Sequence, residues 1–335
     1  MARWHEFTMA VVMTVKNDPM GCAVTLTSLT MQTRPPDEII VVDGGSTDDT
    51  VRLIRQYAAS FPQLRLIEAP GSNIAAGRNL GVRVAKSEII ATTDSGCRAE
   101  PRWLEHLLEP FLNDRRVEFV AGFYRTEPRS LFEEVVGLAT MRGQLDPVCP
   151  DTFNPSARSL ALTKALWQRA GGWPEWLNYS EDTLFDHKVR RMNVGWEFAG
   201  DAIVHWQPRT TVGSLAKQFY HYATGRGHTR IDAAGYLYDV RNLGLMLLVA
   251  AASVVTMWAW PILLTLIGYF GVWAFHDKAV RIVRRTGRRT AYPLLLGIMW
   301  VVVAANVAGF LVGSWQRWRD RNRFQYRTEA YLADA

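Results

Sequence analysis

The sequence predicts an α/β domain followed by a membrane-embedded region. Short runs of β-branched residues end on polar residues, and segments with apolar residues at helical spacing separate these runs. This alternation indicates strands and helices of an open sheet. Residues 243–275 and 291–315 contain no charged residue. Each of these stretches is longer than the roughly 20 apolar residues that a bilayer-spanning helix needs.

The first two predicted strands bring polar residues to one edge of the sheet. Residues 8–15 form an apolar run before a turn signal, and residues 39–42 form a second run that ends at Asp43. A helix predicted over residues 22–31 makes this a right-handed β-α-β unit. We therefore expect Thr14 and Asp43 to be neighbours at the carboxyl ends of parallel strands, where open α/β sheets bind ligands.

Asp43 is followed by two glycines and a helix, which allows two interpretations. A carboxylate at this position can accept hydrogen bonds from a nucleotide, and the glycines let a ligand approach the backbone. Alternatively, Asp43 only helps to cap the following helix, as in any doubly wound protein. We expect Ser46 and Asp49 to form the cap itself.

Two further predicted strands, residues 64–69 and 88–93, extend this pattern. Arg78 lies near the start of the helix between them, and Asp94 follows the second. A buried arginine needs a partner such as a phosphate, a nucleobase edge or Asp43, whereas a solvated helix arginine is the alternative. Two strand-end carboxylates that face a phosphate require a cation between them, and Mg²⁺ or Mn²⁺ would supply it.

The second half of the soluble region continues the alternation. Strands are predicted at residues 117–122 and 160–162, and helices at 131–139 and 164–170. A further helix begins at Ser180-Glu181-Asp182, where Ser180 is expected to cap the helix and the two acids lie at the positive end of its dipole.

The order of these motifs resembles the family 2 glycosyltransferases of GT-A fold over about the first two thirds of the chain. The motifs are the strand with Thr14, residues 42–50, residues 76–81, residues 93–96 and Ser180-Glu181-Asp182. The resemblance implies a Rossmann-like mixed sheet and an inverting transfer from a nucleoside diphosphate sugar, with UDP the expected nucleotide.

The same resemblance implies residue roles. Thr14, Asp43 and Arg78 would hold the nucleoside, and Asp94 with Ser95 would lie beside the ribose, the metal ion and the diphosphate. The aspartate of the family's Glu-Asp motif serves as general base, so Asp182 is the expected base and Glu181 the second choice. Simple helix capping would also explain both acids.

One departure from the family concerns the metal ion. The family motif is Asp-x-Asp, and Gly96 replaces its second acid, so a metal would depend on Asp94, diphosphate oxygens and water. His205 ends a later predicted strand, where GT-A enzymes often supply a histidine ligand. A structural histidine is the alternative.

A second departure concerns the acceptor and diphosphate side. Trp173 follows two glycines and either stacks on a sugar ring or belongs to the core. Residues 218–222 resemble a degraded Gln-x-x-Arg-Trp motif of processive members, since His221-Tyr222 replaces Arg-Trp after Gln218. With Arg226 they could neutralise the diphosphate, or the segment could be an amphipathic helix on the membrane surface.

Charge and composition define the setting. Much of the net charge of +6 comes from arginines that flank the uncharged stretches, in residues 281–289 and 317–327. Such flanks are typical of cytoplasmic loops that contact anionic lipid head groups. They lack the interleaved aromatics of a nucleic-acid site, so no nucleic-acid partner is expected. Three cysteines without metal-ligand spacing imply no disulfide framework.

We therefore expect a catalytic domain over residues 1–235, with a nucleotide-sugar half to about 122 and an acceptor half from about 123 to 235, and a membrane domain over 236–335. The stretch 243–275 is one span kinked at Pro261 or a tight hairpin. The protein would lie in the cell (inner) membrane, multi-pass or re-entrant, with its catalytic domain in the cytoplasm. No signal peptide is expected before the first strand.

The predicted activity is the transfer of a sugar to a lipid-linked or membrane-proximal acceptor, in the synthesis of a cell-envelope polysaccharide or glycolipid. A processive polysaccharide synthase is the nearest alternative, and a catalytically silent nucleotide-sugar-binding membrane partner is another. A dinucleotide oxidoreductase is disfavoured because no Gly-x-Gly-x-x-Gly follows the first strand. The sequence does not indicate an oligomeric state.

Overall fold

The structure is a computed structural model that describes residues 6–150 and 153–335. Its contacts divide the chain into two compact units. The sheet unit comprises Met1–Arg125, Cys149–Gln207 and Glu329–Ala335, and the apolar-helix unit comprises Thr126–Val148 and Pro208–Thr328. Residues 126–148 and 208–235 therefore pack with the apolar helices, although they were expected in the catalytic domain. A functional boundary near residue 235 stays a prediction.

Eight strands form the sheet. In spatial order they are β3 (Leu64–Glu68), β2 (Glu38–Asp43), β1 (Met9–Val15), β4 (Ile89–Asp94), β7 (Leu160–Thr163), β6 (Val117–Thr126), β8 (Gly195–Trp206) and β5 (Arg98–Ala99). The first four are parallel, β7 is antiparallel to β4 and β6, and β5 is antiparallel to β8. The predicted mixed α/β sheet is confirmed.

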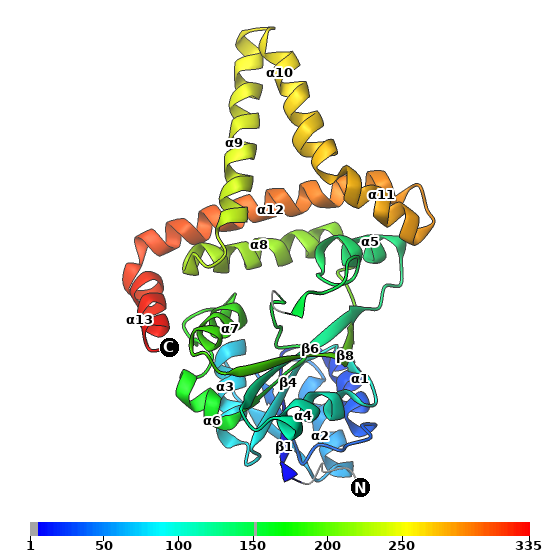
Figure 1. The fold of residues 1–335 in the computed structure, drawn as a ribbon, viewed down its shortest axis with the longest axis vertical. Helices are drawn as coiled ribbons and strands as arrows, with labels where there is room; N and C mark the ends of the chain where they lie inside the picture. The colour runs from blue at the N-terminus through cyan, green and yellow to red at the C-terminus, as the bar shows by residue number, and fades with distance from the viewer. Residues whose placement is uncertain (1–5, 151–152) are drawn as a thin grey trace. The chain divides into compact units, whose positions relative to one another are not determined.

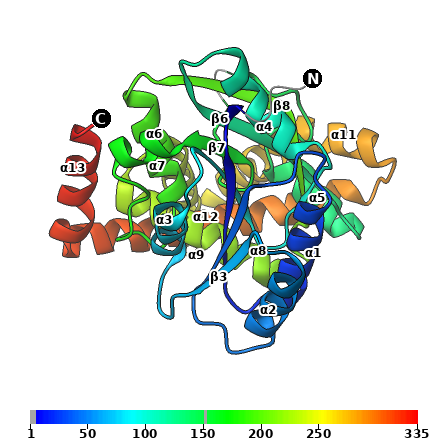
Figure 2. The ribbon, with the colours of Figure 1, turned by 90° about the horizontal axis from the view of Figure 1, so that it is seen from below.

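Helices cover both faces of the sheet, as Figure 2 shows. In that view α1 (Pro19–Thr30) and α2 (Thr50–Ser60) lie on one side of β3. On the other side lie α3 (Ile74–Val84), α6 (Lys164–Ala170) and α7 (Glu181–Arg191). A further helix, α4 (Trp103–Asn113), contacts β8 and β7.

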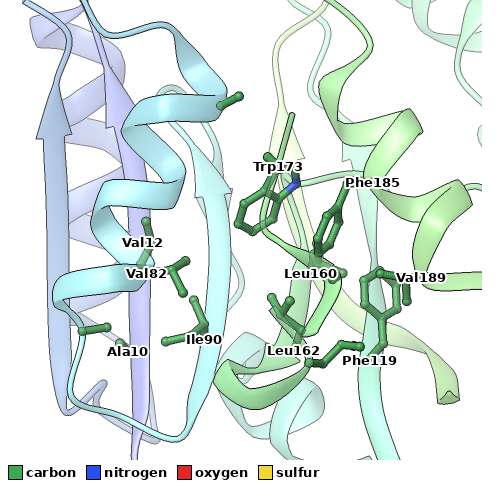
Figure 3. Packing of buried hydrophobic residues seen from close by; sticks show 14 of the residues in the cluster. Ala10, Val12, Val82, Ile90, Phe119, Leu160, Leu162, Trp173, Phe185 and Val189 are labelled. Carbon is green, nitrogen blue, oxygen red and sulfur yellow. The ribbon is translucent and has the colours of Figure 1, made fainter. Parts of the chain in front are cut away.

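The core between the sheet and the second group of helices is apolar (Figure 3). Val12 and Leu162 come from the strands, and Phe185 and Val189 come from one face of α7. Each such side chain stabilises the fold by about 1.5–3 kcal/mol on full burial. This core fixes α3 and α7 over the same sheet.

The expected cap of α2 is wrong. Ser46 Oγ donates to Asp43 Oδ1 at 2.5 Å, and the Asp49 side chain makes no capping bond to any described residue. Asp48 Oδ1 instead accepts hydrogen bonds from the backbone and the hydroxyl of Thr50. Ser46 Oγ also accepts a hydrogen bond from the backbone N–H of Asn17 at 2.8 Å, and α2 begins only at Thr50, so the Ser46 hydroxyl does not cap this helix.

The apolar-helix unit consists of helices (Figure 1). They are α5 (Leu131–Thr140), α8 (Val212–Thr229), α9 (Ala234–Val255), α10 (Ala259–Leu266), the π-helix η3 (Ile267–Trp273), α11 (Ala274–Thr286), α12 (Ala291–Arg319) and the π-helix η4 (Asn322–Tyr326). The last helix, α13 (Arg327–Ala333), follows η4 and belongs to the sheet unit from Glu329 on.

Three helical stretches of this unit are long and apolar enough to cross a membrane. They are Ala234–Val255, Ala259–Thr286 and Ala291–Arg319. The first uncharged stretch is therefore a hairpin of α9 and α10, not one kinked span, and Figure 1 shows its two arms. These helices fit an anchor that associates the protein with a membrane.

Candidate active site

The carboxyl ends of β2, β1 and β4 bring the predicted strand-end residues together. In the register of the sheet, Thr14 lies opposite Asp94 on one side, and Val15 lies opposite Asp43 on the other. The two carboxylates therefore flank the end of β1. The predicted proximity of Thr14 and Asp43 is confirmed.

Two glycines place α3 close to these strands. A Cβ atom on Gly81 would lie 2.4 Å from Val12 Cγ1, and one on Gly77 would lie 3.0 Å from Thr14 Cγ2. Only glycine permits this approach of helix and strand. Arg78, the next residue after Gly77, is thereby held beside the end of β1 and β4, with its side chain only 4 % exposed.

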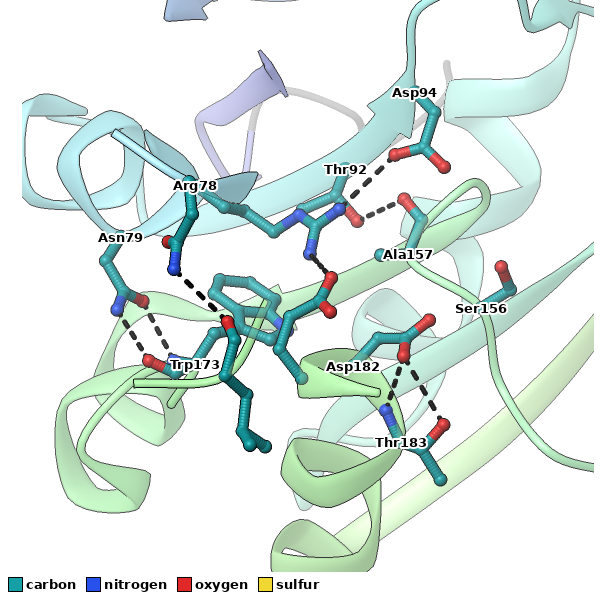
Figure 4. A network of polar contacts seen from close by, with 12 residues as sticks. Arg78, Asn79, Thr92, Asp94, Ser156, Ala157, Trp173, Asp182 and Thr183 are labelled. Atoms are coloured by element: carbon teal, nitrogen blue, oxygen red, sulfur yellow. Dashed lines mark hydrogen bonds and ion pairs between the residues drawn. The ribbon is translucent and has the colours of Figure 1, made fainter. Parts of the chain in front are cut away.

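Arg78 joins two acidic residues from distant parts of the chain (Figure 4). Its Nη2 lies 3.3 Å from Asp94 Oδ1, and its Nη1 lies 3.5 Å from Glu181 Oε1. The side chain of Asp94 is 37 % exposed, whereas that of Glu181 is 10 % exposed. The start of α7 therefore meets the end of β4 through one guanidinium, as the motif order implies.

The pKa of Glu181 lies near neutral pH. Burial and the neighbouring charge of Asp182 raise the pKa of Glu181 to about 7, and Arg78 opposes this rise. A buried carboxyl group loses hydration when it ionises, so its neutral form is favoured. Perturbed carboxyl groups are enriched at functional sites, which supports this end of the sheet as the active site.

Asp182 lies beside Glu181 on the first turn of α7 and is partly exposed. Its Oδ1 accepts hydrogen bonds from the backbone of Thr183 at 2.7 Å and from the Thr183 hydroxyl at 3.3 Å. Ser180, expected to cap the helix, has φ 62° and makes no side-chain capping bond within the described residues. This left-handed backbone is uncommon outside glycine and is found often at functional sites.

Asp43 fixes the shape of the loop that follows it. Its Oδ2 accepts from the backbone N–H groups of Gly45 and Ser46, each at 2.9 Å, and Gly45 has φ 90°. The side chain is almost fully buried. Asp43 thus holds a tight turn at the strand end, and its expected contact with a nucleoside stays a prediction.

Ser95 is tied to an acidic residue that the sequence reading missed. Its Oγ donates to Asp18 Oδ2 at 2.7 Å, and Asp18 also caps α1 by accepting from the Gly21 backbone. Asp18 lies in the turn sequence that follows β1. Its position just after a strand could have indicated a residue of the site. This hydrogen bond between Ser95 and Asp18 connects the loops that follow β4 and β1.

Trp173 belongs to the core. It is fully buried, and its ring centroid lies 4.6 Å from that of Phe185. Its backbone N–H and carbonyl both bond to the side chain of Asn79, at 2.8 Å each. The suggestion that Trp173 stacks on a sugar ring does not agree with this burial. Its ring instead supports Arg78, whose Cζ lies 5.3 Å from the ring centroid.

Arg158 is a second residue that the sequence reading missed. Its Nε lies 3.8 Å from Asp94 Oδ2, and its guanidinium also lies over the rings of Tyr124 and Trp206. The clue lay in topology: β7 is antiparallel to β4, so the residues just before β7 arrive at the carboxyl end of β4. Two guanidinium groups therefore flank Asp94.

His205 lies on β8 opposite Arg98 of β5. Its Nε2 is 2.9 Å from Glu100 Oε1, so this ring nitrogen already has a hydrogen-bond partner. A metal-ligand role would require it to give up that contact or to use its other nitrogen. The role of His205 as ligand therefore stays a prediction, and the structural alternative accounts for the contact seen.

Among the described residues, Asp94 is the carboxylate that the sequence assigned to a divalent cation. Within residues 6–150 and 153–335 there is no group of three or more His, Cys, Asp or Glu side chains arranged to hold a metal ion. Mg²⁺ and related ions commonly use one or two carboxylates, waters and substrate phosphates. Asp94 can supply one such carboxylate, so the donor set fits a metal that arrives with a diphosphate.

The predicted acceptor-side residues on α8 form their own network in the apolar-helix unit. Gln218 Oε1 accepts from Arg209 at 3.1 Å, and its Nε2 donates to the Tyr222 hydroxyl at 2.8 Å. Arg226 pairs with Asp232 at 3.3 Å. Burial and the charge of Lys217 lower the pKa of His221. Their role toward the diphosphate stays a prediction.

Known proteins share this fold and sequence pattern. The family model for glycosyl transferase family 2 matches residues 10–148. The glycosyltransferase AglE of Haloferax volcanii is 33 % identical over 66 % of this chain and 73 % of its own length. The hyaluronan synthase of Pasteurella multocida is 32 % identical over 32 % of this chain, but over only 11 % of its own length.

A solved structure shows the same architecture. The mannosyltransferase PcManGT from Pyrobaculum calidifontis, in complex with GDP-Man and Mn²⁺, matches with a TM-score of 0.52 at 18 % identity, over 98 % of this chain and 85 % of its own. This likeness shows the GT-A-type fold. With the strand-end acids, the Arg78 contact and the relatives in agreement, the chain is a glycosyltransferase and belongs to family 2.

Proposed function

We propose that this enzyme transfers a sugar from a nucleoside diphosphate sugar, with UDP the first nucleotide to test, to a lipid-linked or membrane-proximal acceptor with inversion. The observation that carries the proposal is the contact of Arg78 with both Asp94 and Glu181. It gathers β4, α3 and the start of α7 around one point at the ligand-binding edge of the sheet.

Asp182 acts as the general base in this proposal. It takes the proton of the acceptor hydroxyl while that oxygen bonds to the anomeric carbon and the bond from that carbon to the diphosphate breaks. Asp182 is the more exposed of the two acids at the start of α7, so an acceptor can reach it. Glu181, which is buried against Arg78, positions that guanidinium.

Arg78 and Arg158 neutralise the departing diphosphate in the same proposal. Both lie beside Asp94 and are largely buried, so their charges are poorly screened by water. Mg²⁺ or Mn²⁺ held by Asp94 and diphosphate oxygens would supply further positive charge there. Mn²⁺ is bound in the PcManGT complex, which supports a divalent ion. His205 is the candidate for a further ligand.

Thr14, Asp43 and Ser95 contribute to the nucleoside side of this site, since all three belong to strand ends or loops at the same edge. On α8 we assign Gln218, His221, Tyr222 and Arg226 to the acceptor or diphosphate side. The local likeness to hyaluronan synthase makes a processive synthase the second candidate. The missing Arg-Trp pair after Gln218 favours single transfers.

The test is an assay of nucleotide release from UDP-, GDP- and dTDP-sugars by the purified full chain, with and without Mn²⁺. We expect one nucleotide sugar to be preferred, with the anomeric configuration inverted in the product. Asp182→Asn should reduce kcat by about 10²–10⁴ and leave nucleotide binding intact, whereas the exposed control Glu197→Gln should keep full activity. Equal turnover by Asp182→Asn and wild type would remove Asp182 as base. A long polymer as product would favour the synthase.

A further inference from the structure

The apolar-helix unit poses a question of membrane topology, because it contains three apolar helices between two segments of the sheet unit. The chain leaves the sheet unit after Gln207 and returns to it at Glu329. The number of complete membrane crossings between these two points must be even if both segments lie on one side. Three helices that are all long enough cannot therefore all cross.

The return to the sheet unit is well anchored. Tyr331 of α13 is buried, and its hydroxyl donates to the carbonyl of Gly172 at 2.6 Å. Lys188 Nζ lies 4.3 Å from the centroid of the Tyr331 ring, and Trp176 packs edge-on against that ring. These contacts fix the C-terminal segment on the same side of the membrane as the active site.

The first half of α12 packs on the short, charge-bearing segment Thr126–Val148. Leu295 and Ile298 of α12 share a core with Val135 and Val136 of α5. The segment Thr126–Val148 that contains α5 leaves the sheet unit and rejoins it within 23 residues, and it carries several charged side chains. Such a segment cannot cross a bilayer twice, because each helical crossing needs roughly 20 apolar residues.

The second half of α12 packs along α8. A Cβ atom on Gly309 would lie 2.2 Å from the carbonyl oxygen of Tyr220, and one on Gly313 would lie 2.2 Å from that of Thr224. The Gln316 side chain bonds to His228 at 2.6 Å. Since α8 follows the sheet unit directly and carries charged residues, both halves of α12 pack on elements that carry charge, which favours a position of α12 along the membrane surface.

The hairpin of α9 and α10 stands away from this layer. Tyr236 of α9 stacks on Phe310 of α12, and Gly271 of η3 approaches the Trp300 ring of α12. Both arms therefore contact α12 at the base of the hairpin, and Figure 1 shows them extending steeply away from it. The apolar side chains at the far end of the hairpin are highly exposed, with Val255 at 89 % and Trp258 at 83 %. Such exposed apolar side chains suit a membrane environment.

The uncharged part of each arm is shorter than the hydrocarbon core is thick, although each complete helical stretch is long enough to cross it. The outgoing arm has 13 residues from Leu243 to Val255, and the returning arm has 17 from Ala259 to Phe275. At about 1.5 Å per residue they reach about 20 and 25 Å, less than the roughly 30 Å of the hydrocarbon core. Charged residues, Arg241 and Asp277, lie at the base of the two arms.

Several backbone N–H groups of the turn at the tip are satisfied within the hairpin, which lowers the cost of placing a turn in hydrocarbon. The Thr256 N–H donates to Ala252, the Ala259 N–H to Thr256 and the Trp260 N–H to Met257. The next residue is Pro261, which has no N–H to satisfy. The tip contains no charged residue, which suits a position in hydrocarbon.

We propose that the protein enters the membrane from one side only. The α9–α10 hairpin penetrates the bilayer part-way and returns, α11 and α12 lie along the interface, and the arginines of residues 281–289 and 317–327 face anionic head groups on the side of the active site. Trp315 and Trp318, both exposed on α12, suit that interface. This proposal concerns anchoring and does not depend on the chemistry proposed above.

Single cysteines test the topology in the full chain. Cys22 and Cys97 are buried, and burial raises the pKa of each thiol to about 12, so only the exposed Cys149 must be replaced by serine. Into this background we would place Met257→Cys at the tip, Arg288→Cys in the basic loop or Ala335→Cys at the C-terminal end. All three positions are exposed, so cysteine should be tolerated.

An impermeant maleimide is applied to sealed cells and to inverted membrane vesicles. The Arg288→Cys and Ala335→Cys variants should react in the same preparation, and the Met257→Cys variant should lose reactivity in both until detergent is added. Reaction of Met257→Cys from the face opposite Arg288→Cys would establish a crossing hairpin and overturn the proposal. Reaction of Arg288→Cys and Ala335→Cys from opposite faces would mean that α12 crosses. Reaction of Met257→Cys together with Arg288→Cys would place the tip in water.

A nitroxide attached to the thiol of the Met257→Cys variant shows whether lipid or a second copy of the protein surrounds the tip. In liposomes that contain anionic lipid, the label should collide with oxygen, which concentrates in hydrocarbon, and should be shielded from a water-soluble nickel complex. Shielding from both reagents would mean that a second copy covers the tip, and would overturn the proposal. The same label on the Arg288→Cys variant is the matched control and should respond to the nickel complex.

Discussion

The guanidinium of Arg78 lies over the indole ring of Trp173, with its Cζ 5.3 Å from the ring centroid. Trp173 is itself locked by Phe185 and by both backbone bonds to Asn79. An arginine held from below by a rigid aromatic side chain keeps its donors aimed at Asp94 and Glu181 without loss of further side-chain entropy. This packing explains why a core tryptophan bears on the active site.

Replacement of Arg78 by lysine should lower kcat/KM by about 10²-fold. Lysine keeps the charge but has one ammonium group, so it cannot reach Asp94 and Glu181 together or stack on Trp173 as a planar group. Steady-state kinetics with the preferred nucleotide sugar would measure the loss. Arg83→Lys, an exposed position on the same helix, is the control. Unchanged kcat/KM in Arg78→Lys would contradict the role of the guanidinium group in joining Asp94 and Glu181.

Replacement of Glu181 by glutamine should change how stability depends on pH. In wild type the pKa of Glu181 is raised from its ordinary value near 4.5 to about 7 in the folded state. The stabilisation linked to its bound proton is therefore complete below pH 4.5 and is lost as pH rises to about 7. Glu181→Gln lacks this loss. Between pH 5 and pH 8 its free energy of unfolding should therefore rise relative to that of wild type by up to about 3 kcal/mol.

Thermal unfolding of both proteins in the same detergent at pH 5 and pH 8 would measure this difference. The Tm of wild type should fall relative to that of Glu181→Gln as pH rises. Glu118→Gln, whose surface pair with Arg169 lies away from the site, controls for general effects of charge removal. A parallel course of the two Tm values would show that Glu181 is already ionised at pH 5.

The sequence sufficed for the parallel part of the sheet and for the residues at its edge. Thr14, Asp43 and Asp94 were predictable because a run of β-branched residues that ends on a polar residue reports both the strand and its end. Neighbouring parallel strands then place such ends together. Local pattern and one topological rule were enough.

Arg158 and Trp173 were beyond the reach of local pattern. The position of Arg158 beside Asp94 depends on β7 being antiparallel to β4, which no residue near Arg158 encodes. The burial of Trp173 depends on Phe185 and Asn79 from other elements. The cap assigned to Ser46 failed for a similar reason, because the Ser46 hydroxyl accepts from the backbone of Asn17, in the loop after β1, and donates to Asp43.

Binding of Mn²⁺ should require a nucleoside diphosphate. Asp94 lies between Arg78 and Arg158, whose charges repel a free cation, and diphosphate oxygens would complete the ligand set. Titration of the full chain with Mn²⁺, followed by electron paramagnetic resonance, should detect tight binding only when UDP or the preferred nucleotide is present. Asp94→Asn should abolish that binding. Tight binding of Mn²⁺ by the nucleotide-free protein would contradict this dependence.

Two glycines of α12 should respond in opposite ways to alanine. Gly313 lies against α8, where a Cβ atom would meet the Thr224 carbonyl oxygen at 2.2 Å, whereas a Cβ atom on Gly297 would meet no described atom within 4 Å. Gly313→Ala must therefore push the helices apart, at a cost of about 1–3 kcal/mol. Gly297→Ala should stabilise the helix by about 0.5–1 kcal/mol, because alanine has less backbone entropy to lose.

Thermal unfolding in mild detergent would measure both variants, and accessibility of Tyr222 and its neighbours on α8 to proteolysis would report the separation of α8 from α12. If α12 lay free of α8 and crossed the bilayer alone, the two alanine variants would behave alike. A selective loss of stability in Gly313→Ala would support the contact that holds α12 in the plane of the membrane, because only that contact distinguishes the two positions.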